Sequence, residues 1–100
     1  MRCGSYNTFF EVIASKIRMK ILELLMKESL CVGDICSRLG EEQSKISHNL
    51  KKLADCNFVE VTQEGKNRIY SLNKDTILPL MQLVDKHTKK YCCKNCCKNR

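Results

Sequence analysis

The chain has few residues that interrupt regular structure, with one proline (Pro79) and four glycines in 100 residues. Tryptophan is absent, and only 6% of the residues are aromatic. No apolar run approaches the roughly 20 residues that a helix needs to span a bilayer, so we expect no membrane partner. No glycine-rich phosphate loop or acid–base pair is apparent, so we do not expect an enzyme. These absences favour one small helical domain.

Cysteine, by contrast, is abundant. An even number of thiols in a short chain can indicate a disulfide framework, but Met1-Arg2-Cys3-Gly4 leads straight into polar residues, with no secretory signal. The thiols also lie in or beside helical patterns and do not punctuate a loop-rich scaffold. We therefore expect reduced thiols and a cytoplasmic location. The eight cysteines are Cys3, Cys31, Cys36, Cys56, Cys92, Cys93, Cys96 and Cys97.

Positive charge is in excess and unevenly placed. The net charge of +7 suggests an anionic partner, and nucleic acid is the first candidate. Residues 86–100 hold six cationic side chains and no carboxylate side chain, whereas residues 1–85 are nearly balanced, with 12 cations against 11 acids. A prediction of DNA binding must therefore rest on motifs more than on total charge.

Apolar residues at helical spacing predict four helices in the first half of the chain. Two are expected before residue 26, the first of them ending near residue 14. A third runs from Val32 to Leu39 and is closed by Gly40, the residue type expected just after a helix C-terminus. A fourth runs from Gln43 to Asp55. The two helices that flank Gly40 have the size and spacing of a helix-turn-helix.

The pattern changes to strands near residue 58. Residues 58–62 and 68–72 are rich in β-branched and aromatic side chains, and a glycine-containing loop over residues 63–67 joins them. After Asn73 a last helix is predicted towards Lys90, with a proline about one turn in, where its missing N–H costs little. The order ααααββα predicts a mainly α fold with a small β-hairpin (α+β), a winged helix-turn-helix over residues 1–91. Residues 92–100 form a tail rich in cysteine and lysine.

Short polar and cationic side chains occupy the outer faces of the fourth predicted helix. Such groups can reach base edges and phosphates from within a DNA groove. A solvated helix face is the simpler interpretation, but the preceding short helix, the glycine turn and the cationic hairpin favour DNA recognition. Lys66 and Arg68 on the hairpin are expected to contact phosphates or enter a minor groove. The candidate residues on the helix are Gln43, Ser44, Lys45, Ser47, His48 and Lys51.

Four segments, in this order and spacing, resemble the ArsR/SmtB family of metalloregulatory repressors. The resemblance covers about residues 8–90. It implies a homodimer built on the first and last helices. It also implies binding of the metal-free dimer to a pseudo-palindromic double-stranded DNA operator, and release when an inducer binds. The segments are VIASKIRMKILELL (12–25), SLCVGDIC (29–36), QSKISHNLKKL (43–53) and EGKNRIYSL (64–72).

The chain departs from the family at two metal sites. Members often carry Cys-Val-Cys at the start of the third helix, where this chain has Cys31-Val32-Gly33. Cys36 falls where arsenite-responsive members carry a further cysteine, so two thiols remain on this helix.

The second departure is in the last helix. Zinc-type members use an Asp, two His and a Glu there. Asp75 and His87 fall near the first and third of these positions, but Ile77 and Lys90 stand at the others. By this interpretation His87 is a surface histidine and Asp75 a carboxylate of the helix's first turn.

The C-terminal tail holds four thiols among cations. If the last helix continues, Cys92 and Cys96 are one turn apart, as are Cys93 and Cys97, and Cys93 and Cys96 also form a CxxC pair. Such thiolates favour Cu(I) and Zn(II), and the family resemblance adds As(III), Sb(III), Cd(II) and Pb(II). A basic tail with incidental cysteines is the alternative. The predicted metal ligands are Cys92, Cys93, Cys96, Cys97, Cys31 and Cys36.

Three hypotheses follow. The first is a dimeric repressor that leaves its operator when a thiophilic ion binds cysteine thiolates. The second is a thiol-redox-responsive repressor, in which a reductant rather than a chelator would restore DNA binding. The third is a small metal-storage or thiol-transfer protein, which predicts no sequence-specific DNA binding.

Overall fold

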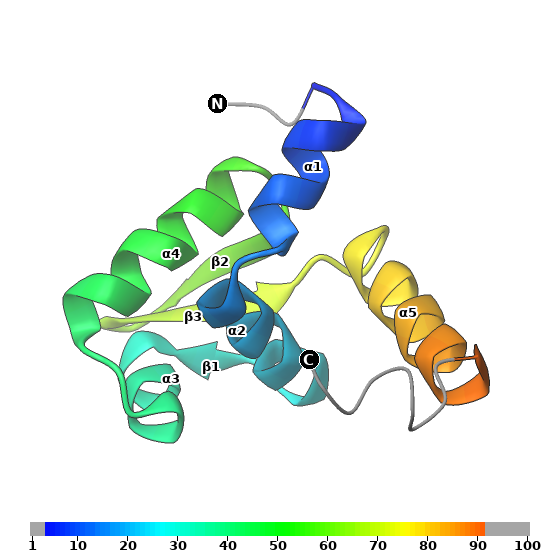
Figure 1. The fold of residues 1–100 in the computed structure, drawn as a ribbon. Helices are drawn as coiled ribbons and strands as arrows, with labels where there is room; N and C mark the ends of the chain where they lie inside the picture. Colours follow the sequence, from blue (N-terminus) through cyan, green and yellow to red (C-terminus); the bar gives the residue numbers. More distant parts are fainter. Residues whose placement is uncertain (1–3, 92–100) are drawn as a thin grey trace.

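The computed structural model describes residues 4–91, which form five helices and three strands packed around one core (Figure 1). In chain order they are α1 (Tyr6–Ile13), α2 (Lys16–Lys27), β1 (Leu30–Cys31), α3 (Val32–Leu39), α4 (Gln43–Asp55), β2 (Val59–Glu64), β3 (Asn67–Leu72) and α5 (Ile77–Tyr91). None of the helices in this part of the chain is both long and apolar enough to cross a membrane. The predicted bounds of α3 and α4 are confirmed.

The core is built from the apolar stripes of the helices and one face of the sheet. α2 contributes Ile21 and Leu22, and α4 contributes Ile46, Leu50 and Leu53, all with no exposed surface. Burial of an aliphatic side chain of this size stabilises a fold by about 1.5–3 kcal/mol. These contacts fix which face of α4 turns inward.

The helix ends are defined by polar caps and left-handed residues. The Ser5 and Ser15 hydroxyls accept the Thr8 and Arg18 backbone N–H groups at 3.2 and 3.4 Å, which starts α1 and α2. After α4, Asn57 takes a left-handed conformation with φ of 62°. Its N–H donates to the Ala54 carbonyl, and the next N–H donates to the Leu53 carbonyl at 2.8 Å. This Schellman motif ends α4 and turns the chain into β2.

The strands form a three-stranded antiparallel sheet in the order β1-β3-β2. β1 pairs Leu30 with Tyr70. This two-residue strand was not predicted, because two residues are too short to show an alternating pattern. Its place between α2 and α3 adds one strand to the predicted order ααααββα.

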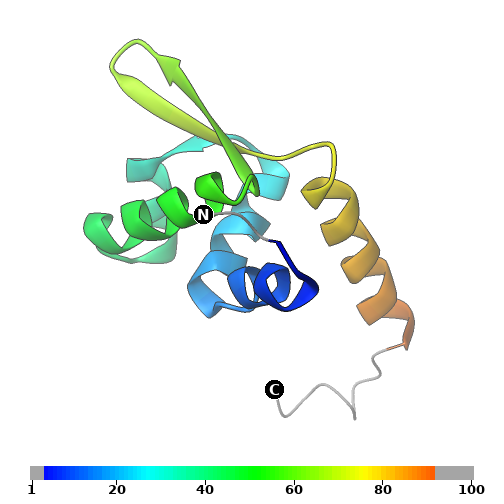
Figure 2. The ribbon, with the colours of Figure 1, turned by 90° about the horizontal axis from the view of Figure 1, so that it is seen from above.

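The β2–β3 hairpin has a tighter turn than the predicted loop over residues 63–67. Glu64 pairs with Asn67, which leaves Gly65 and Lys66 as a two-residue turn. Gly65 has φ of 62° and Lys66 has no positive φ, the pattern of a type II′ turn. The strands therefore extend to the tip, and the hairpin projects well beyond the helical body (Figure 2).

α5 meets the rest of the fold at its start only. Ile77 and Met81 are buried, but every residue from 82 to 91 is exposed. In Figure 2 the second half of α5 stands clear of the other helices. The helix therefore presents an open side along most of its length.

Candidate nucleic-acid interface

α4 presents a polar face to solvent, opposite its buried apolar stripe. The six predicted side chains of this helix, Gln43, Ser44, Lys45, Ser47, His48 and Lys51, are all exposed. Gly40 separates α4 from α3 with φ of 65°, and its N–H donates to the Cys36 carbonyl at 2.8 Å. This glycine ends α3 and lets the chain turn into α4, as a helix-turn-helix requires.

The start of α4 carries two acids. Glu42 is the N-cap residue, and its side chain makes no capping hydrogen bond. Glu41 forms an ion pair with Lys45, with 3.3 Å between Oε1 and Nζ. Lys45 is therefore already paired with an acid, whereas no such pair is found for Lys51 in the described part of the chain.

The wing is the β2–β3 hairpin. All its residues from Glu60 to Arg68 are exposed. Lys66 stands at the turn and Arg68 at the second position of β3. The Gln63 side-chain amide donates to the Gly65 carbonyl at 3.1 Å, which braces the tip. Both predicted cations are thus free to reach outward from an extended arm.

Pattern analysis missed a polar link beneath this surface. Asn49 lies among the apolar residues of α4 and is only 7% exposed, the one buried polar side chain of residues 4–91. The Arg18 Nε donates to its Oδ1 at 3.0 Å. The signal available in the sequence was a polar residue at a position three after Ile46 and four before Leu53, inside the apolar stripe.

The thiols of the described residues do not complete a metal site by themselves. Cys31 and Cys36 are both half-buried, and Cys36 packs against the core, as does Cys56. Residues 4–91 contain no group of three or more His, Cys, Asp or Glu side chains placed to hold a metal ion. The predicted ligands Cys92, Cys93, Cys96 and Cys97 lie outside the described residues.

Asp75 and His87, which fall near the family's zinc-site positions, lie in different parts of the structure. Asp75 stands in the turn before α5, not in its first turn as predicted, because the Asn73 Oδ1 accepts the Asp75 and Thr76 N–H groups and delays the helix to Ile77. His87 is exposed, with its ring centroid 5.1 Å from that of Tyr91.

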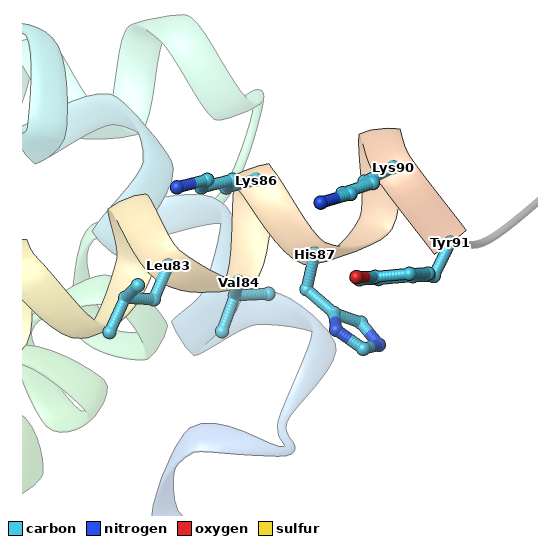
Figure 3. A pocket seen from close by; sticks show the side chains of 6 residues that line it. All are labelled: Leu83, Val84, Lys86, His87, Lys90 and Tyr91. Atoms are coloured by element: carbon cyan, nitrogen blue, oxygen red, sulfur yellow. The ribbon is translucent and has the colours of Figure 1, made fainter.

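Large apolar side chains are exposed on α1 and α5. Tyr6 is 87% and Phe10 56% exposed on α1, and Leu83 and Tyr91 are 62% and 63% exposed on α5. Figure 3 shows Leu83, Val84 and His87 pointing to one side of α5. The two helices predicted to form a dimer are therefore the two that leave large apolar groups uncovered.

The helix-turn-helix, the exposed polar face of α4 and the projecting hairpin define a winged helix-turn-helix protein. Residues 15–61 match the family model described as "Bacterial regulatory protein, arsR family". Among curated relatives, the transcriptional repressor SdpR of Bacillus subtilis is 30% identical over 80% of this chain and 93% of its own length. The chain belongs to the ArsR/SmtB family of transcriptional regulators.

Two other relatives carry names that refer to SmtB or to arsenic resistance. The transcriptional repressor SmtB homolog of Synechocystis is 29% identical over 79% of this chain, which spans only 60% of that protein. The arsenical resistance operon repressor of Bacillus subtilis is 29% identical over 88% of this chain and 79% of its own length. These relatives are regulators rather than enzymes.

Solved structures confirm the winged helix-turn-helix. Rv0081 of Mycobacterium tuberculosis has a TM-score of 0.78 and 30% identity, covering 84% of this chain and 85% of that one. The DNA-binding domain of Mb0332 from Mycobacterium bovis has a TM-score of 0.77 and 26% identity, covering 82% of this chain and 76% of that one. The Mb0332 domain is described as homodimeric and as possibly an ArsR-family regulator.

Proposed function

We propose that this chain is a DNA-binding transcriptional repressor that acts as a homodimer on a two-part operator. The observation that carries the proposal is the division of α4 into two faces. Ile46, Leu50 and Leu53 are fully buried, and the six polar or cationic candidates are all exposed beside a projecting wing. A helix anchored in this way can place short polar groups against base edges in a major groove.

The wing would add contacts that bind DNA without reading its sequence. Lys66 and Arg68 are exposed at the end of an extended arm. Cations at such a position neutralise phosphates and release counterions, which strengthens binding at low salt. α4 would then supply the sequence preference, and the wing would supply affinity and register.

The proposed dimer interface lies on α1 and α5. Phe10 and Leu83 are more than half exposed, and every described residue of α5 after Met81 is exposed. Large apolar groups that a single chain leaves exposed favour association, because burial removes them from water. The homodimeric state of the Mb0332 domain supports the same assembly here.

We further propose that a thiophilic ion, As(III), Cd(II), Zn(II), Pb(II) or Cu(I), induces release from DNA by binding cysteine thiolates. Cys31 and Cys36 supply two partly exposed thiols, which is one fewer than trigonal As(III) requires and two fewer than tetrahedral Zn(II). The remaining ligands would come from Cys92, Cys93, Cys96 and Cys97. Ion binding would favour a dimer whose recognition helices no longer match successive grooves.

The test is fluorescence anisotropy with the reduced, metal-free protein and DNA from upstream of its own gene, with each ion added in turn. Release by one ion, reversed by a chelator, is the expected result. The variant with Cys92, Cys93, Cys96 and Cys97 changed to serine should bind DNA but ignore the ion, and Cys56→Ser should respond normally. Release that only an oxidant causes and a reductant reverses would replace metal sensing with redox control. Absence of specific DNA binding would contradict the repressor itself.

A further inference from the structure

The Arg18 side chain joins three helices. From α2, its Nη1 donates to the Val12 carbonyl at 2.9 Å, and its Nε donates to the Asn49 Oδ1 at 3.0 Å. The Val12 carbonyl belongs to the last turn of α1, where carbonyls have no partner within the helix. One guanidinium therefore donates a hydrogen bond to a carbonyl at the end of α1 and another to a side chain in the middle of α4.

Asn49 carries the link onward to the start of α4. Its Nδ2 donates to the Lys45 carbonyl at 2.9 Å, in the first turn of the helix. Both polar ends of the amide are thus occupied, and no buried side-chain nitrogen or oxygen in residues 4–91 lacks a partner. A fully satisfied polar network inside a core holds its members in one geometry, because each hydrogen bond is directional.

Apolar side chains of α2 and α4 also pack in the core, and their packing imposes less direction. Ile21, Leu22 and Leu50 are fully buried at the centre of the fold, and such burial depends mainly on area rather than on angle. An aliphatic residue of similar length at position 18 could fill the same space. What it could not do is hold α1 and α4 at a set angle through one planar group with two fixed donors.

We propose that Arg18 is a positioning residue for DNA binding, which sets the orientation of the recognition helix α4 relative to α1. This inference rests on the proposed dimer, in which α1 forms part of the interface. In a dimer the two copies of α4 must enter successive major grooves about 34 Å apart. The angle between α1 and α4 then decides which half-site spacing the dimer accepts.

The test compares two operators that differ only in the spacing between half-sites. The first is the operator found by footprinting the wild-type protein, and the second carries two additional base pairs at its centre. The wild-type dimer should prefer the first by roughly tenfold or more, since the second lets only one half bind in register. Arg18→Met should reduce this preference to within about threefold, with helix content retained.

Three further variants separate positioning from stability. Arg18→Lys keeps the charge but loses the planar fork, and should also lose the spacing preference. Asn49→Leu should have the same effect, and combining it with Arg18→Met should add little, because the two residues share one hydrogen bond. Arg38→Met removes an arginine of the α3 surface, paired with Glu28 at 2.9 Å, and should keep the full preference.

Two results would overturn the inference in distinguishable ways. If Arg18→Met and Arg18→Lys melt at a lower temperature but keep the wild-type preference for one spacing, Arg18 serves stability alone and the repressor proposal stands. If the wild-type protein itself binds both operators equally, the two-part operator of the proposed function is wrong, and the inference falls with it.

Discussion

Replacement of Lys66 by alanine should weaken DNA binding and make the affinity less dependent on salt concentration. Lys66 is exposed at the hairpin turn, and residues 4–91 show no ion pair that involves it, so its removal should leave the fold intact. Each phosphate contact contributes about 0.9 to the slope of log affinity against log salt. A dimer that loses one contact per subunit should therefore have a slope about 1.8 shallower.

The assay is anisotropy at several salt concentrations between 50 and 200 mM. Over this fourfold range of salt, a slope difference of about 1.8 means that the ratio of wild-type affinity to Lys66→Ala affinity falls roughly twelvefold. Lys27→Ala, which removes an exposed lysine from the end of α2, is the matched control and should keep the wild-type slope. Equal slopes for wild type and Lys66→Ala would refute a phosphate contact by the wing.

Other predictions test the acid before α4, the left-handed residue that ends this helix, and the proposed dimer interface. Glu41→Gln should tighten binding to DNA of any sequence by roughly two- to tenfold, because it frees Lys45 and removes a charge that repels phosphates; unchanged anisotropy curves would place this acid away from DNA. Asn57→Val should lower the free energy of unfolding in urea by about 1–2 kcal/mol through its left-handed φ, whereas Asn57→Gly should not. Leu83→Lys should raise the dimer dissociation constant at least about tenfold in sedimentation, and Val61→Lys, at a similarly exposed apolar site on the wing, should not.

Much of the fold could be predicted because local signals agree with the tertiary structure. The spacing of Ile46, Leu50 and Leu53 defines the inner face of α4, and the glycine at position 40 marks the turn before it. β1 could not be predicted, because its two residues become a strand only through pairing with β3. The two-residue turn was not predicted, because the pairing of Glu64 with Asn67 depends on the register between the two strands and cannot be deduced from residue types alone.

Only the exposed side chains of the candidate interface could be predicted from the sequence, and not the hydrogen bonds beneath them. Polar side chains opposite an apolar stripe must be exposed, so the exposure of the six α4 candidates could be predicted, and the two wing cations are exposed as well. The hydrogen bond between Arg18 and Asn49 joins residues 31 positions apart, so no periodic pattern in the sequence indicates it. An arginine in an otherwise amphipathic helix resembles any surface cation until its partner is known.

The most direct test of the repressor is a hydroxyl-radical footprint of the wild-type protein on the DNA upstream of its own gene. The account predicts two protected half-sites related by approximate two-fold symmetry, with centres about 10 base pairs or a multiple of this apart. Protection that follows no sequence, or a single protected half-site at saturating protein, would contradict a dimer that reads DNA with two copies of α4.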